Sequence, residues 1–411
     1  MEYSDKANGF QAGTAFIAGV VVFAFAHLAI AEPGLTPDNS PCDVGALLQD
    51  VLKRHRVPGI AAVVLNGDQI VAQGVAGVRK NGAPERITMD DQFLLCSGTK
   101  AMTATLAAMA VEEGKLSYTT TLGDIFPDRT VQMRPQWKEV TLAQLLQHRA
   151  GVPPESGRLW TLLRLHFSKR PTAEKRQAIV EKILARNPKY PPGTKYVYTA
   201  LDYLIIGEVL EKVYGCSWEE LIQKRLWHPL EITSGGFGAP GVPGSVDEPW
   251  GHWGMLISGH PAAPGGFWSR LSMPLFFGPG GAARMTTTDW AKFIALHLRG
   301  DPANPRHHEA LLKSDSFALL HEAALNPDYQ AGWYIGTRPW AKGGRPGDTG
   351  RVIASQGDNG FWHAEAWIAP ECDFAVLVIC NQGGTGSKPA ASACNDAMGV
   401  LIKDFLPKPK D

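Results

Sequence analysis

The sequence lacks most of the short patterns by which hydrolases and metalloenzymes are identified. No serine lies in a Gly-x-Ser-x-Gly elbow, and neither a His-Glu-x-x-His stretch nor a phosphate-loop lysine motif is present. The six cysteines contain no Cys-x-x-Cys pair, and His252 and the stretch His307-His308-Glu309 lack the spacing of zinc ligands. These absences argue against α/β-hydrolase, P-loop and zinc chemistry, and we expect these histidines to be loop residues.

The chain also has no excess of positive over negative side chains, or the reverse. The 411 residues carry 40 Lys plus Arg against 40 Asp plus Glu, so no global field favours nucleic acid as a partner. Hydrophobic residues make up 44% of the chain, which is ample for a large core. Because such a core needs no disulfides, we expect the cysteines to be mostly buried thiols.

The first feature that is present is an apolar run near the N-terminus. The stretch TAFIAGVVVFAFAHLAIA ends in Ala29-Ile30-Ala31, a small-x-small pattern that is typical of a signal-peptide cleavage site. The positive charge ahead of the run is weak, so an uncleaved signal anchor remains an alternative. We expect residues 1–31 to be a signal peptide or anchor and residues 32–411 to be one exported domain, periplasmic or extracellular, with possible membrane attachment.

Strand patterns lie near both ends of the chain and helical patterns lie between them. Two apolar runs flank Asn66-Gly67-Asp68, which is a strong hairpin signal. Two further strand-like runs, FWHAEAWIAP and DFAVLVICNQ, precede a closing helix near residues 389–405. From about 233 to 281 the chain is rich in Gly, Pro and Trp, and we expect a long functional loop there. This layout predicts an α+β fold with a helical and loop insertion at about 115–285.

Ser97 and Lys100 are the leading candidates for catalysis. They stand three residues apart where the apolar helix of residues 97–113 begins, so their side chains share one helix face. A lysine in that position can take the hydroxyl proton and turn Ser97 into a nucleophile. Ser97 is the only serine with a lysine three residues on. The alternative is that Ser97 is merely an N-cap, a position that serine favours.

These residues belong to a wider resemblance that covers nearly all of residues 45 to 405. The stretches that carry it, in order, are SGTKAMTATLAAMAVEEGKL, VTLAQLLQHRAGVP, PPGTKYVYTALDYLIIGEVLEKVYG, GPGGAARMTTTDWAKF and NGFWHAEAWIAP. The sequence resembles the serine β-lactamase and penicillin-binding-protein superfamily, in particular the class C β-lactamase branch with its D-alanyl-D-alanine carboxypeptidases, D-aminopeptidases and family VIII esterases. The resemblance implies an antiparallel sheet flanked by helices, with a helical subdomain between the N- and C-terminal strands. It implies no metal and no organic cofactor.

The family's second motif, Tyr-x-Asn, matches here only in part. Its tyrosine falls on Tyr198, and its asparagine is replaced by Ala200. The resemblance gives Tyr198 a share in proton transfer with Lys100. Tyr196 and Tyr203 fit a core aromatic equally well, and only the register after Pro192-Gly193-Thr194 selects Tyr198.

The third motif, Lys-Thr-Gly or His-x-Gly, falls on Ser355-Gln356-Gly357, so its cationic first residue is a serine. We expect Ser355, Gly357 and Asp358 to bind substrate, with Gly357 letting it approach the strand and the N–H groups of Ser97 and Asp358 forming an oxyanion hole. Asp348-Thr349-Gly350 is a competing alignment. Arg351 could supply the missing charge from another position.

Together these features predict an exported serine hydrolase that acts through a Ser-Lys-Tyr acyl-enzyme mechanism on a small-molecule or peptide ester or amide. Because the motif cation and the asparagine are missing, we expect an esterase or peptidase rather than a true β-lactamase. The alternative is a catalytically degenerate member that binds cell-wall peptides without turnover.

Overall fold

The computed structural model describes residues 40–129, 132–153, 168–253, 260–267, 269, 274–322, 329–384 and 389–408. The expected signal peptide or anchor at residues 1–31 lies outside these ranges. Within them, no helix combines the length and the apolar character needed to cross a membrane.

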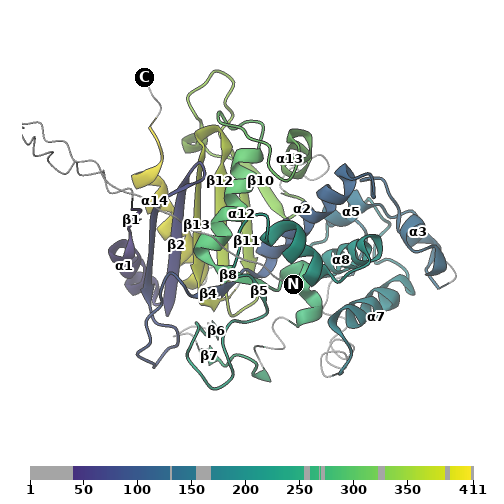
Figure 1. Cartoon of the computed structure of the whole chain (residues 1–411), viewed down its shortest axis with the longest axis horizontal. Coiled ribbons are helices and arrows are strands. Elements are labelled where there is room, and N and C mark those ends of the chain that lie inside the picture. Colours follow the sequence, from purple (N-terminus) through teal and green to yellow (C-terminus); the bar gives the residue numbers. More distant parts are fainter. Residues whose placement is uncertain are drawn as a thin grey trace, which may run out of the picture. The chain divides into compact units, whose positions relative to one another are not determined.

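An eight-stranded sheet forms the body of the domain, in the order β1-β3-β2-β13-β12-β11-β10-β9 (Figure 1). Neighbouring strands are antiparallel except for the short β1–β3 pair, which is parallel. The strands are β1 (Cys42–Asp43), β2 (Gly59–Asn66), β3 (Gln69–Gly77), β9 (Tyr329–Gln330), β10 (Trp333–Thr337), β11 (Arg351–Asp358), β12 (His363–Ala369) and β13 (Phe374–Cys380). The predicted hairpin is confirmed, because β2 ends at Asn66 and β3 begins at Gln69, with Gly67 at φ 64°.

Each face of the sheet is covered by helices, which explains why its central strands are apolar on both sides. Along β2, Ile60, Ala62 and Val64 enter one hydrophobic core, and the residues between them enter the other. Helices α1 (Gly45–His55) and α14 (Pro389–Phe405) pack on the first face, and α2 (Thr99–Glu112) and α12 (Thr287–Gly300) contribute to the core on the other (Figure 1). The expected α+β class with an antiparallel sheet flanked by helices is confirmed.

A group of helices lies beside α2, between β4 and β8 in the sequence (Figure 1). Its members are α3 (Leu122–Ile125), α4 (Pro135–Lys138), α5 (Leu142–Leu146), α7 (Thr172–Leu184), α8 (Ala200–Tyr214) and α9 (Trp218–Ile222). Their apolar side chains join the core that α2 enters. Helix α13 (Ser314–His321) follows α12 later in the chain.

The Gly/Pro/Trp-rich segment contains more regular structure than the sequence predicts. Two small sheets have the orders β4-β8-β5 and β14-β6-β7. Their strands are β4 (Gln92–Leu94), β5 (Gly236–Phe237), β6 (Gly251–Trp253), β7 (His260–Ala262), β8 (Ala283–Thr286) and β14 (Gln382–Gly383). His252 is therefore not a loop residue: it lies in β6, fully buried, and its ring contacts Asn381 O at 2.7 Å and the Asn81 N–H at 3.0 Å.

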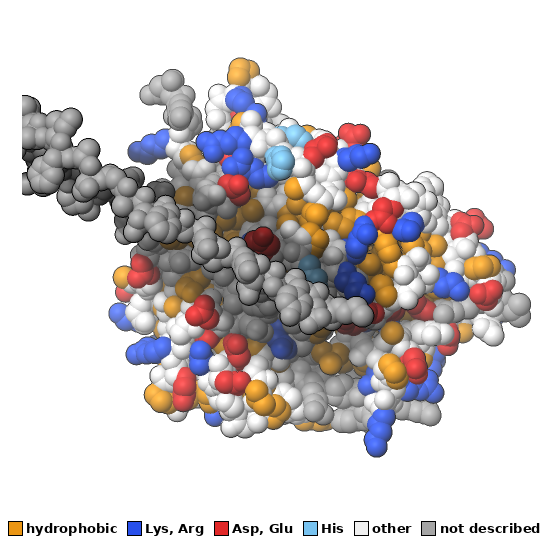
Figure 2. All heavy atoms as spheres, viewed as in Figure 1, with side chains coloured by type: hydrophobic (Ala, Val, Ile, Leu, Met, Phe, Trp, Pro, Cys, Tyr) orange, Lys and Arg blue, Asp and Glu red, His pale blue; other side chains and the backbone are white. Residues whose placement is uncertain are grey.

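The surface follows the balanced composition. Basic and acidic side chains are interspersed on the face shown in Figure 2. All six cysteines are free thiols: Cys96, Cys380 and Cys394 are buried, and Cys42 is exposed.

Candidate active site

Ser97 lies in a strained turn immediately before α2. The turn η1 (Cys96–Gly98) follows β4, and Cys96 has φ 49°, in the left-handed region that non-glycine residues enter at a cost of roughly 1–3 kcal/mol. The N-cap of α2 is Gly98, and no side chain caps the helix. The N-cap interpretation of Ser97 is therefore wrong for this structure.

Lys100 is held against Ser97 in the first turn of α2. Its Nζ donates to Ser97 Oγ at 3.0 Å and to the Gly280 carbonyl at 2.6 Å, and the side chain is only 1% exposed. Gly280 belongs to the short helix α11 (Gly278–Gly281) and packs closely on Ala200, since a Cβ at position 280 would stand 3.1 Å from the Ala200 carbonyl oxygen. The Gly280 carbonyl thus gives the buried Lys100 Nζ a second polar partner beside Ser97 Oγ.

Tyr198 lies on the open side of this pair. Its ring centroid is 5.0 Å from Lys100 Nζ, and the side chain is 38% exposed. Tyr203 also lies near Lys100, at 5.7 Å, but it is fully buried and its hydroxyl donates to the Leu146 carbonyl. Of the three candidate tyrosines, Tyr198 alone lines the described cavity that contains Ser97.

A buried histidine, His148, packs against the Tyr198 ring, and no sequence pattern predicted it. His148 lies 4.5 Å from the Tyr198 ring, between centroids. Its Nδ1 is 2.8 Å from Asp202 Oδ2, and its Nε2 is 3.1 Å from the Tyr329 hydroxyl. Burial, and then the charge of Lys100, hold the pKa of His148 well below its usual range. A neutral imidazole at this point adds no second positive charge beside Lys100. The positive φ of His148, 54°, has no sequence signal.

Strand β11 presents two different faces to the site. Ser355 and Gly357 point toward η1 and α2, and a Cβ at Gly357 would stand 2.1 Å from the Leu95 carbonyl and 2.9 Å from Ser97 N. The close approach that Gly357 permits is therefore that of the nucleophile's own backbone, in addition to any approach by substrate. Ser355 is 2% exposed, and its Oγ has no hydrogen-bond partner among the described residues.

The opposite face of β11 carries Gln356 and Asp358 into a cavity of about 260 Å³. Its lining residues are Ser97, Tyr198, Tyr334, Gln356, Asp358, His363, Gly384 and Ala391. The registered pairs of β10 and β11 run from Thr337↔Arg351 to Tyr334↔Ala354, so β10 leaves the edge of β11 unpaired beyond Ala354. The structure thus brings Ser97, Tyr198 and Asp358 to one cavity, whereas Ser355 and Gly357 lie beneath it.

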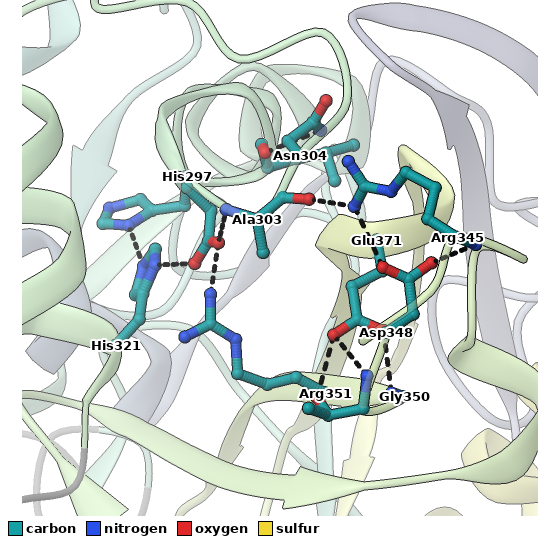
Figure 3. A network of polar contacts seen from close by, with 12 residues as sticks. His297, Ala303, Asn304, His321, Arg345, Asp348, Gly350, Arg351 and Glu371 are labelled. Carbon is teal, nitrogen blue, oxygen red and sulfur yellow. Dashed lines mark hydrogen bonds and ion pairs between the residues drawn. The ribbon is translucent and has the colours of Figure 1, made fainter.

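Arg351 does not supply charge to this cavity. It stands seven residues before Asp358 on β11, about 23 Å along an extended strand. Its guanidinium pairs with Asp301, which also contacts His321, in the buried network of Figure 3. The competing motif alignment lies at the same far end, where the N–H groups of Thr349 and Gly350 donate to Glu371. The structure therefore rules out that alignment.

His363 is the cation that the sequence analysis missed in the cavity. Burial would lower its pKa, but the hydrogen bond to Asp358 and the nearby carboxylate of Glu365 outweigh burial and raise the pKa to about 9. It is therefore an imidazolium at neutral pH, paired with carboxylates. Among the described residues, no cluster of three His, Cys, Asp or Glu side chains could hold a metal ion.

Comparisons with known proteins agree with this geometry. The family model described as Beta-lactamase matches residues 44–396. The chain is 28% identical over 363 residues to "Penicillin-binding protein 4" of Amycolatopsis lactamdurans, covering 86% of this chain and 88% of that protein. It is 30% identical over 176 residues to a "Lovastatin esterase" of Penicillium rubens, covering 38% of this chain and 42% of the esterase. The fold is similar to that of a class C beta lactamase from Rhodobacter sphaeroides, with a TM-score of 0.62, 18% identity, and coverage of 87% of this chain and 98% of that one.

Proposed function

Because this chain belongs to the beta-lactamase family and is a serine hydrolase, we propose that it cleaves an ester or amide through an acyl-enzyme formed on Ser97. The observation that carries the proposal is the 3.0 Å contact between Lys100 Nζ and Ser97 Oγ in a buried, strained turn. Oγ attacks the carbonyl carbon as the unprotonated amine of Lys100 takes its proton, and Tyr198 relays that same proton to the leaving group as the bond to the carbonyl carbon breaks. Water then hydrolyses the acyl-enzyme and restores the Ser97 hydroxyl.

The N–H groups of Ser97 and Asp358 are proposed to bind the oxyanion. In the antiparallel β11–β12 pair, hydrogen-bonded and non-hydrogen-bonded residue pairs alternate. The Asn359 N–H donates to the Trp362 carbonyl, so the adjacent pair Asp358–His363 is non-hydrogen-bonded. The Asp358 N–H consequently points away from β12, toward the edge that β10 leaves open.

Replacing Ser97 tests the nucleophile. We expect Ser97→Ala to abolish both hydrolysis of p-nitrophenyl butyrate and covalent labelling by a fluorophosphonate, while the unfolding transition stays unchanged. Labelling that persists in Ser97→Ala would disprove the assignment. A wild-type chain that binds cell-wall peptides but is neither labelled nor active would instead be the degenerate family member.

We also propose that the site prefers neutral substrates to anionic ones. His363, the one cationic side chain among the described lining residues, is paired with Asp358, and Arg351 is paired with Asp301. A substrate carboxylate would thus lack a charge-assisted hydrogen bond worth roughly 1.5–3 kcal/mol, or about 10- to 150-fold.

Measuring kcat/KM for nitrocefin and p-nitrophenyl butyrate on one preparation tests this preference. We expect measurable esterase activity and weak or no turnover of nitrocefin. A clear preference for nitrocefin would reject the proposal, and so would a large gain of ester turnover on adding a carboxylate beside the scissile bond.

Export is proposed from the sequence alone, on the apolar run that ends at Ala31. Intact-mass analysis of the protein from its native host is the test. We expect a mature chain that starts near Glu32, and a mass that includes residues 1–31 would indicate an anchor instead.

A further inference from the structure

His363 connects the cavity to the backbone that is proposed to bind the oxyanion. It is the first residue of β12 and is 2% exposed, and it lines the cavity together with Ser97 and Tyr198. Its Nδ1 lies 2.9 Å from Asp358 Oδ2, and its Nε2 lies 3.6 Å from Glu365 Oε2. The imidazole therefore lies between two carboxylates. One of them belongs to Asp358, whose backbone N–H points toward the unpaired edge of β11.

The Asp358 carboxylate is itself a junction of three chain segments. Oδ1 accepts the Gly360 N–H at 2.7 Å, and both oxygens accept the Gly384 N–H at 3.0–3.1 Å. The carboxylate thus joins the end of β11, the β11–β12 turn and the segment after β14. His363 provides the side-chain donor in this arrangement.

We infer that His363 is a positioning residue of the oxyanion site: it fixes the Asp358 carboxylate, and through it the direction of the Asp358 N–H at the open edge of β11. This inference rests on the proposed acyl transfer at Ser97. The backbone N–H and the carboxylate both belong to Asp358, the last residue of β11. If the Asp358 side chain rotates away from His363, Gly360 and Gly384, the β11–β12 turn loses the hydrogen bonds that fix the orientation of the Asp358 peptide group. Misplacing a reacting group by about 1 Å costs on the order of 10²-fold in rate.

The titratable groups that face His363 come from three elements besides its own strand. Asp358 lies opposite on β11, Cys380 lies opposite on β13, and Cys394 of α14 contacts Cys380 at 3.5 Å. Glu365 is two residues along β12. Because the two carboxylates keep the ring protonated to about pH 9, loss of the proton should weaken the junction only above neutral pH.

Two substitutions separate the hydrogen bond from the charge. The amide of His363→Asn can occupy the place of Nδ1 and still donate to Asp358, whereas the amide of His363→Gln reaches the place of Nε2 and leaves the Asp358 carboxylate with its backbone donors but no side-chain donor. We expect His363→Gln to lower kcat for p-nitrophenyl butyrate about 10- to 100-fold with KM within about twofold. We expect His363→Asn to recover most of kcat and to lack the alkaline decline near pH 9 that the wild type shows.

His321 offers a matched control in the same molecule. Its Nδ1 lies 2.7 Å from Asp301 Oδ2 in a fully buried pair at the far end of β11 (Figure 3). We expect His321→Gln to lower stability but to leave kcat, KM and the pH profile of the folded enzyme unchanged.

Binding of phenylboronic acid, which forms a tetrahedral adduct with a serine nucleophile, should weaken in His363→Gln by the same factor as kcat. An unchanged kcat in His363→Gln, a change confined to KM, or an equal loss in His321→Gln would overturn the inference. Mass-mapped fluorophosphonate labelling of Ser97 in the wild type shows separately whether the proposed function holds. A wild-type protein that is neither labelled nor active would disprove both the proposed function and the role of His363.

Discussion

At the scale of single residues, Gly357 is where the sheet and the nucleophile come closest. A methyl group at this position would overlap the Leu95 carbonyl and press on Ser97 N, and both are backbone atoms that cannot rotate away. We therefore expect Gly357→Ala to reduce the free energy of unfolding by about 1–3 kcal/mol and ester turnover by about 10²-fold. Urea unfolding and steady-state kinetics on the purified variant measure the two effects.

Gly399 provides the control for this substitution. It lies in α14, and a Cβ there would meet no atom within 4 Å. Gly399→Ala should stabilise the protein by about 0.5–1 kcal/mol, because alanine is the better helix former, and should leave turnover unchanged. A Gly357→Ala enzyme with normal turnover would show that the Ser97 turn tolerates displacement.

The sequence predicts individual residues only where a pattern carries chemistry. The spacing of Ser97 and Lys100 pointed to a contact that the structure places at 3.0 Å. Gly280, His148 and His363 have no such pattern: the first acts through a carbonyl, and the other two are placed by contacts between segments distant in sequence. Of the three β11 residues predicted to bind substrate, Asp358 lines the cavity, whereas the Ser355 side chain and the Gly357 Cα face η1.

At the scale of elements, one buried arginine joins the helices beside the site. Arg176 of α7 is fully buried and pairs with Glu211 of α8 and Glu219 of α9, and it donates to the Phe276 carbonyl. Removing one partner of a buried ion pair leaves the others uncompensated, which costs about 3–5 kcal/mol. We therefore expect Arg176→Leu to lower the free energy of unfolding, measured in urea, by about 3–5 kcal/mol.

The exposed pair of Lys212 and Asp128 is the comparison for Arg176. Its atoms are 3.5 Å apart at the surface, so Lys212→Met should change the free energy of unfolding by less than about 1 kcal/mol. If both substitutions have equally small effects, the Arg176 cluster does not hold the helices together.

Regular elements with a clear period were predictable, and short ones were not. The hairpin at Gly67, the apolar helix after Ser97 and the closing helix near residue 389 have strong local signals and are present. The small sheets made by β4, β5 and β8 and by β6, β7 and β14 consist of two- to four-residue strands, and apart from the β6–β7 pair their partners are distant in sequence. A strand of that length carries no readable alternation, so its existence depends on tertiary contacts.

At the scale of the whole molecule, two buried histidines whose pKa values shift in opposite directions contribute opposite pH dependences to stability. Burial lowers the pKa of His252 to about 4, whereas Asp358 and Glu365, working against burial, raise the pKa of His363 to about 9. Both groups have a pKa near 6.5 in the unfolded chain. Below pH 6.5 the unfolded state takes up a proton that buried His252 refuses, so stability falls as the pH drops toward 4. The stabilisation that protonated His363 contributes is fully present below pH 6.5 and is lost as the pH rises toward 9.

We therefore expect the free energy of unfolding to be greatest near pH 6.5 and to decline on both sides. Each of these two pKa displacements corresponds to about 3 kcal/mol. Burial also lowers the pKa of His148 and His297, so the acid decline should be the steeper of the two. Urea unfolding at pH 5, 6.5 and 9 measures the curve, and His363→Gln should flatten its alkaline side while leaving its acid side in place. Stability that rises from pH 6.5 to 9 in the wild type would mean that His363 is not held as an imidazolium, and its hydrogen bond to Asp358 would then lack the charge that distinguishes it.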